Sequence, residues 1–116
     1  MAWTALKLNW TAKDYFNYAD MDKIEKNVQA VWELMKSKNV QVVITAGVFQ
    51  RNMWWIPYKE EFARVENNLE TLRSPNTPIG WRSRDLPWTE DQPFGYLDLN
   101  RWERNLNLLW EYYSTL

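Results

Sequence analysis

The 116-residue chain contains no cysteine and no histidine. Without cysteine it has neither a disulfide nor a thiolate for catalysis or metal binding. Without histidine it lacks the commonest metal ligand and the side chain that most often acts as a general base. These two absences exclude a Ser-His-Asp triad, a Cys–His pair and the usual zinc sites.

Glycine, net charge and long apolar runs are also scarce. The three glycines, Gly47, Gly80 and Gly95, are isolated, so the chain has no glycine-rich phosphate loop. A net charge of −1 gives no electrostatic reason to bind nucleic acid or an anionic membrane surface. The longest mostly apolar run, 42–49, is too short to span a bilayer, and the N-terminus does not read as a secretory signal. We therefore expect no nucleic-acid partner, no membrane insertion and synthesis in a cytoplasm.

A site built from carboxylates alone, for acid–base chemistry or Mg²⁺ binding, remains formally possible. Asp20 with Asp22 forms one set, and Glu60 with Glu61 and Glu66 forms the other. Both sets fall at the first turns of expected helices, where negative charge stabilises the helix dipole. We therefore expect no enzyme activity, no catalytic residue, no cofactor and no bound metal ion.

Aromatic residues, in contrast, are abundant. Nine Trp, six Tyr and four Phe make up 16% of the chain. A small domain can use Trp to thicken its core, and Trp is also enriched at binding surfaces. Both interpretations stay open at this point.

One motif occurs three times in the chain. Residues 10–33 and 88–111 align without a gap at an offset of 78, and nine of the 24 positions are identical. A shorter copy occupies 61–72. Such self-similarity indicates a fold built from a copied unit. We expect a single domain over 1–116, with repeat units at 8–36, 58–73 and 86–113. Two arms, the first arm (37–57) and the second arm (74–95), would join them.

Each repeat predicts one amphipathic helix, so the expected fold class is mainly α. The expected spans are 18–36, 58–73 and 96–113, with starting signals at Asn17, Pro57 and Gly95. Apolar residues recur at alternating spacings of three and four along each span. These are Met21, Ile24, Val28, Val31 and Met35, then Phe62, Val65, Leu69 and Leu72, then Leu99, Trp102, Leu106, Leu109 and Tyr113.

Polar residues also recur beside the apolar stripe. A Glu and an Asn return in every copy, and a solvent-facing position does not need the same residue type three times. These are Glu25, Asn27, Glu66, Asn68, Glu103 and Asn105. We expect them to tie the extended arms to the helices by satisfying backbone groups. The recurring basic residues Lys23, Arg64 and Arg101 are expected to be solvated or paired surface charges.

The arms differ from each other. In the first arm, Val40–Thr45 reads as a strand and Val48–Ile56 as a second one, giving a small β-hairpin near 40–56. An exposed apolar edge would aggregate, so this arm must pack on the helices or pair with another chain. The second arm holds four of the five prolines and is expected to be an irregular linker. Residues 81–84 within it have the composition of an ordinary surface loop, and the alternative is a loop that stacks on and hydrogen-bonds to a partner.

The phrases NWTAKDYFNYADMDKIEKN and PWTEDQPFGYLDLNRWERN resemble a pattern in small phage and prophage proteins of Gram-positive bacteria. There a Trp-Thr and an extended aromatic stretch precede Asp-(Leu/Met)-(Asn/Asp)-(Arg/Lys)-(Ile/Trp)-Glu-x-Asn. Such segments occur in tail, baseplate or tail-fibre proteins. The resemblance implies a virion structural role and carries over no catalytic residue. The middle copy departs from the pattern because it lacks a clear Trp-Thr lead-in.

The leading functional hypothesis is therefore a phage virion component in the tail, the baseplate or a fibre attachment point. Its partners would be copies of itself and other virion proteins, with the arms reaching neighbouring subunits. A carbohydrate-binding module for host cell wall glycan is an alternative from another class. A head decoration or collar protein, or an inhibitor of a host enzyme, is a further alternative. The candidate partner interface is Trp54, Trp55, Trp81, Arg82 and Arg84.

Overall fold

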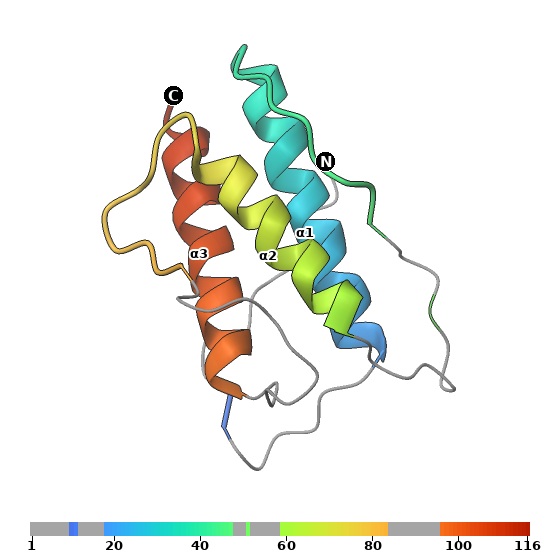
Figure 1. Ribbon diagram of the computed structural model, residues 1–116. Coiled ribbons are helices and arrows are strands. Elements are labelled where there is room, and N and C mark those ends of the chain that lie inside the picture. The colour runs from blue at the N-terminus through green and yellow to red at the C-terminus, as the bar shows by residue number, and fades with distance from the viewer. Residues whose placement is uncertain (1–9, 12–17, 48–50, 52–58, 84–95) are drawn as a thin grey trace.

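The described part of the chain contains three helices (Figure 1). The computed structural model describes residues 10–11, 18–47, 51, 59–83 and 96–116. In these ranges, α1 spans Tyr18–Ser37, α2 spans Lys59–Arg73 and α3 spans Tyr96–Ser114. The mainly helical class and the three predicted helices are thus confirmed, with each boundary within one residue.

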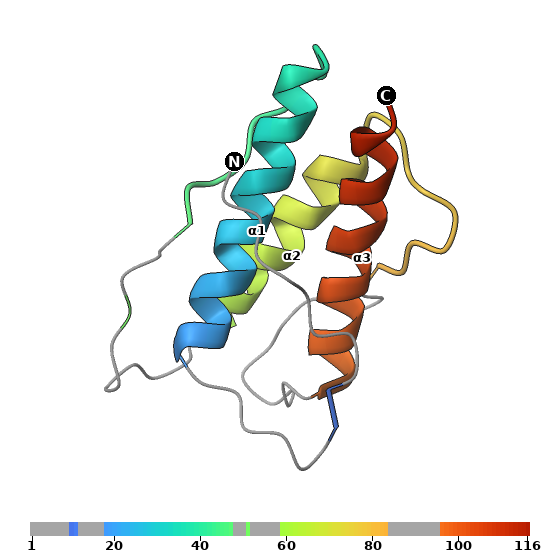
Figure 2. The same ribbon diagram turned by 180° about the vertical axis from the view of Figure 1, so that it is seen from behind.

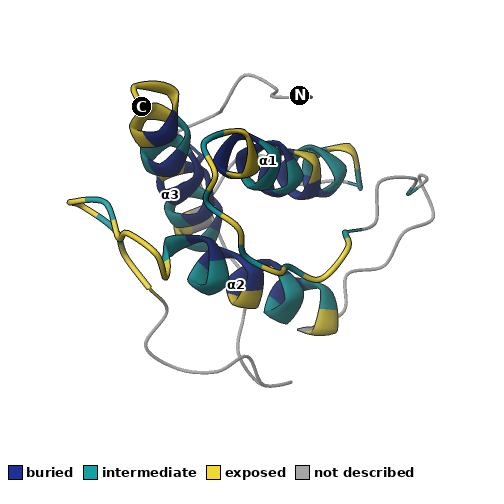
Figure 3. Ribbon diagram, turned by 90° about the horizontal axis from the view of Figure 1, so that it is seen from above, coloured by how far each residue is buried: buried dark blue, intermediate teal, exposed yellow. Residues whose placement is uncertain are grey.

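All three helices run in the same direction, as the colour gradient along each one shows (Figures 1 and 2). A parallel arrangement forces the chain to return along the length of each helix before the next one begins. The 20-residue α1 is about 30 Å long, so an extended return needs about nine residues. The long arms of the sequence therefore follow from the parallel packing of the repeats. Residues 40–47 make such a return between α1 and α2 (Figure 3).

The core lies where the three apolar stripes meet. The buried sides of the helices turn toward one another in the view from above (Figure 3). Every residue of the three predicted stripes is buried, and Trp10 joins the same cluster from the N-terminal segment. Helical periodicity therefore identified this core correctly, because residues three and four apart share one face of a helix.

The end of α1 is set by a left-handed residue. Asn39 has φ of 63°, and the backbone amides of Val40 and Asn39 donate to the carbonyls of Met35 and Lys36. This pair of bonds is the Schellman motif, in which an αL residue closes the last turn. It turns the chain sharply into the first arm. The predicted starting residues Asn17, Pro57 and Gly95 lie outside the described residues.

The predicted strand at Val40–Thr45 is wrong, because the described residues contain no strand. This segment is extended, and the side chains of Val40, Val42 and Ile44 do alternate inward onto the core. Its backbone, however, meets side chains of α1 and α2 instead of a second strand. The predicted second strand at 48–56 lies outside the described residues, apart from Arg51. Over 40–47 the first arm packs on helices of its own chain.

Nothing in the described helices combines the length and apolarity that a membrane crossing requires.

Tyr113 gives a prediction about core stability. Its side chain is buried, and its hydroxyl finds no hydrogen-bond partner in the part of the chain that the structure describes. Burial penalises the charged phenolate more than the neutral hydroxyl, and this, together with the charge of the neighbouring Tyr112, raises the pKa of Tyr113. We expect Tyr113→Phe to raise the free energy of unfolding by about 1 kcal/mol at neutral pH. Urea denaturation followed by circular dichroism measures this change.

The same variant tests the sign of the pH dependence. Above about pH 10 the unfolded chain releases the Tyr113 proton before the folded chain does, so stability from this group falls as pH rises. The Tyr113→Phe variant lacks this loss, and its advantage over the wild type should widen at alkaline pH. Tyr112→Phe is the matched control at neutral pH, because Tyr112 is exposed. At alkaline pH it removes the charge that helps to raise the pKa of Tyr113, so there it is expected to reduce the pH dependence of stability only in part. A destabilised Tyr113→Phe variant would show that the hydroxyl makes a stabilising contact.

Candidate functional site

The recurring charges form a cyclic set of ion pairs between the helices. The basic residue of each repeat binds the Glu of the repeat before it, and the first repeat binds the third. The pairs are Arg64 with Glu25, Arg101 with Glu66, and Lys23 with Glu103. Each boundary between two helices, called a seam below, therefore holds one equivalent pair. The residues predicted to be surface charges are instead partly buried, at 14–18% side-chain exposure.

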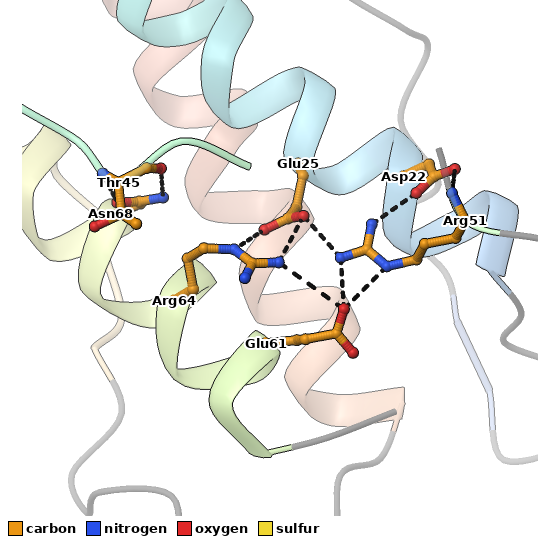
Figure 4. A network of polar contacts seen from close by, with 7 residues as sticks. All are labelled: Asp22, Glu25, Thr45, Arg51, Glu61, Arg64 and Asn68. Carbon is orange, nitrogen blue, oxygen red and sulfur yellow. Dashed lines mark hydrogen bonds and ion pairs between the residues drawn. The ribbon is translucent and has the colours of Figure 1, made fainter. Parts of the chain in front are cut away.

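In the α1–α2 seam, Glu25 is held by two arginines (Figure 4). Arg64 binds it in a fork, with Nε 2.6 Å from Oε1 and a terminal nitrogen 2.9 Å from Oε2. Arg51, from the first arm, lies 2.8 Å from Glu25 Oε2 on the other side. Forked guanidinium–carboxylate contacts are geometrically specific, so they fix how α1 and α2 face each other.

Arg51 is the hub of this seam. Its guanidinium also donates to Asp22 and Glu61, and its backbone amide donates to Asp22 Oδ2. The side chain is only 2% exposed. Burial by itself would lower the pKa of Arg51, but hydrogen bonds to Glu25, Asp22 and Glu61 outweigh it and raise the pKa. The sequence analysis did not identify Arg51 as a structural residue.

Trp10 takes the corresponding place in the α3–α1 seam. Its indole N–H donates to Glu103, and its backbone amide and carbonyl bind the side-chain amide of Asn100. Trp10 precedes Glu25 by 15 residues, and Arg51 precedes Glu66 by the same 15. Equivalent positions of two repeats therefore reach the Glu of the preceding helix with different chemistry. Lys23 Nζ completes the seam, 2.8 Å from Glu103 Oε1.

The α2–α3 seam uses a donor from the helix itself. Trp102 Nε1 lies 2.5 Å from Glu66 Oε1, and Arg101 forms a fork with the same carboxylate. Arg101 also contacts Asp98 at 3.3 Å. Burial alone would lower the pKa of Arg101, but its hydrogen bonds and charge attraction to Glu66 raise it. All three recurring Glu side chains thus bind side chains across a seam, whereas the sequence predicted that they bind backbone groups of the arms.

The recurring Asn residues hold the arms. Asn68 accepts from the Thr45 amide at 2.8 Å and donates to the Thr45 carbonyl at 2.9 Å. Asn105 makes the same two bonds with Arg82, at 3.2 and 2.7 Å. The spacing is 23 residues in both cases. These contacts agree with the expectation that Asn satisfies the backbone of an extended segment. Asn27 is also buried, and the same spacing leads to Thr4, which lies outside the described residues.

Trp32 adds a further link to the first arm and borders a hollow. Its indole N–H donates to the Val42 carbonyl at 2.7 Å, and Lys36 Nζ lies 5.3 Å from the ring centroid. A hollow of about 210 Å³ lies beside it, between α1, the arm and α2. Its lining comprises Glu25, Val28, Gln29, Trp32, Ile44, Thr45, Ala46, Gly47 and Asn68.

The predicted partner interface is only partly described. Trp54, Trp55 and Arg84 lie outside the described residues. Trp81 is half-buried against the core, and its Nε1 donates to Ser83 Oγ at 3.1 Å. Arg82 is exposed and borders an open hollow of about 580 Å³ on α3. The other lining residues are Leu97, Asn100, Arg101, Arg104, Asn107 and Leu108.

The polar side chains of these sites hold the helices and the arms in position. Asp22, Glu25 and Glu61 are engaged by arginine, so their lone pairs are directed at guanidinium groups. Across the residues that the structure describes, no three metal-ligating side chains gather into one group. The fold and its contacts define a class: three parallel helical repeats closed on themselves by a cycle of ion pairs. No protein-family model, curated protein or solved structure matches the chain.

Proposed function

We propose that the chain is a structural protein of a phage virion, in the tail, the baseplate or a fibre attachment point. It acts through subunit assembly and has no catalytic role. The proposal rests on the contacts that the recurring motif residues make. The basic residue and the Glu of each copy bind across a seam, and Asn68 and Asn105 bind an arm. A motif whose polar residues stabilise the fold is expected in a subunit that acts by contacting neighbouring subunits.

The hollow on α3 offers such a surface. Arg82 and Arg104 border it and form no ion pair with any described residue, and its lining contains no acidic side chain. Leu97 adds apolar area, since it is 69% exposed. Guanidinium groups beside exposed Leu complement a neighbour that carries carboxylates and apolar side chains. We infer an acidic segment of another virion protein as the occupant.

The proposal is tested on particles purified from a culture that encodes the chain. Quantitative mass spectrometry should find its peptides in fixed ratio to the major tail protein, also after washing with concentrated salt. Gold-labelled antibodies would then place it at the tail or baseplate, or at the head or collar. Peptides found only in the soluble fraction of lysed cells, as for replication proteins of the same phage, would overturn the proposal.

A carbohydrate-binding role remains the second candidate, favoured by the hollow beside Trp32. Indole rings stack on sugar faces, and Gln29, Thr45 and Asn68 bring polar groups to the same hollow. Cosedimentation of the protein with purified cell wall tests this role. Trp32→Phe should weaken such binding several-fold if Trp32 is the platform, whereas Trp110→Phe serves as the control on α3. Absence of cosedimentation by the wild type would eliminate this candidate.

A further inference from the structure

The α3–α1 seam joins two helices that are not consecutive in the sequence, unlike the other two seams. The first arm connects α1 to α2 and the second arm connects α2 to α3, but no segment leads directly from α3 to α1. That seam is held by the contacts of Trp10 and Lys23 with Glu103 and of Trp10 with Asn100. Lys38 Nζ adds a bond of 2.7 Å to the Leu116 carbonyl. α3 is therefore joined to the rest of the fold by one covalent connection.

We propose that two copies of this chain assemble by exchanging α3 together with the part of the second arm that follows residue 78. In the exchanged dimer, α3 of each chain completes the three-helix unit of the other. Exchange of α3 would be one way in which subunits assemble. Its role in a virion rests on the proposed function, but the exchange itself does not.

Charge and hydrogen-bond complementarity make a second copy the fitting occupant. The α3 side of this seam presents the Glu103 carboxylate and both groups of the Asn100 side-chain amide. The α1 side presents the Lys23 ammonium, the Trp10 indole N–H, and the Trp10 backbone amide and carbonyl. The two sides differ, so one chain cannot satisfy the same side of another, and contact must run from α3 to α1. Exchange restores every contact of the closed unit, and for this reason domain swapping is a low-cost route to dimers.

The hinge of the exchange is at 74–78, directly after α2. Ser74, Pro75, Asn76 and Thr77 are exposed, and two of the five residues are proline. Proline fixes its own φ and disfavours helix at the residue before it, so α2 ends here. The bonds that tie this stretch to α2 are local and exposed: Ser74 donates to the Thr71 carbonyl, and the Thr77 hydroxyl donates to the Arg73 carbonyl. The corresponding junction after α1 is closed by the Schellman motif at Asn39 and leads at once into the packed Val40. Opening therefore occurs after α2 and not after α1.

The test is the molar mass of hinge variants by size-exclusion chromatography with light scattering. Deletion of residues 74–78 leaves three residues, 79–81, between Arg73 at the end of α2 and Arg82, which is clamped on Asn105. These four Cα–Cα steps span at most roughly 14 Å. This shortened chain should form a dimer, with twice the molar mass of one shortened chain, at every concentration. The control, six Gly/Ser residues inserted after Thr77, should be monomeric. The wild type should lie between them, with dimer increasing after refolding at high concentration.

Cross-linking identifies the exchange itself. The chain has no cysteine, so Lys38→Cys and Leu116→Cys each introduce a single thiol. In a mixture of the two variants in the hinge-deleted form, a short bis-maleimide should link Lys38→Cys chains to Leu116→Cys chains in excess over like pairs. Lys26→Cys, at an exposed site of α1, replaces Lys38→Cys in the control and should show no excess.

The outcomes separate this proposal from the virion role. A folded monomer of the hinge-deleted chain would overturn the exchange, and so would a chain that stays unfolded at high concentration, because the exchanged dimer needs no fold-back at the hinge. A dimer without preferential cross-linking would also overturn it. All these measurements use the purified protein alone, so they hold whether or not particles contain the chain.

Discussion

Replacing Arg51 with Met is expected to lower the free energy of unfolding by about 3–5 kcal/mol, the usual range for breaking a buried ion pair. The guanidinium of Arg51 is 2% exposed and bridges Asp22, Glu25 and Glu61. Met fills a similar volume but leaves these three carboxylates without their shared cation. Glu25 would lose one of its two arginine partners, Arg51, in a site where its side chain is 2% exposed. Urea denaturation followed by far-ultraviolet circular dichroism gives the change.

Arg104→Met is the matched control for this loss. Arg104 is exposed on α3 and pairs with no described residue, so its replacement should change stability by no more than about 0.5 kcal/mol. If the two variants lost equal stability, the Arg51 cluster would contribute nothing beyond an ordinary surface charge. Adding salt should reduce the difference in unfolding free energy between the two variants only slightly, because salt screens buried ion pairs weakly.

Truncating Trp102 to Ala is expected to cost about 3–5 kcal/mol, as for other large-to-small changes of a buried aromatic residue. Trp102 is fully buried on α3, its ring centroid lies 6.1 Å from that of Phe62, and its indole N–H binds Glu66. The change therefore opens a cavity and removes a donor from a carboxylate. Thermal and urea unfolding would both report the loss.

Trp102→Phe separates these two causes. It retains an aromatic ring but removes the N–H, so its cost should be smaller than that of Trp102→Ala. Leu97→Ala is the control for truncating a side chain to Ala on the same helix, because Leu97 is exposed. A loss below about 1 kcal/mol in Trp102→Ala would mean that the core closes over the missing ring, contrary to close packing.

The cycle of ion pairs favours one arrangement of helices that internal repetition makes similar to one another. Three helices with similar apolar stripes can pack in several registers and orders with comparable burial. A buried charge pair contributes little net stability, but it selects against arrangements that leave a charge unpaired. Because each repeat donates to the one before it, the pairs specify both neighbour and direction. We infer that this selection explains the recurrence of Lys23, Arg64 and Arg101 beside the Glu residues.

The sequence contained part of this signal. A basic residue two positions before Glu recurs in all three copies, and recurrence itself favours a partner over solvent. The equivalence of Trp10 and Arg51 was harder to find. Their side chains share no chemistry, and only the common spacing of 15 residues to the next Glu relates them. A position that holds an indole in one repeat and a guanidinium in another forms no residue pattern to detect.

The sequence by itself determined the three helices, their bounds and their buried faces, because periodicity and helix signals act within a few residues of one another. It also indicated that Asn residues would bind extended backbone. Only the tertiary structure decided that the helices run parallel, that residues 40–45 pair with helix side chains instead of a strand, and that Lys23 reaches Glu103 across 80 residues of chain. Direction and pairing depend on contacts between segments far apart in sequence, and local propensity does not encode such contacts.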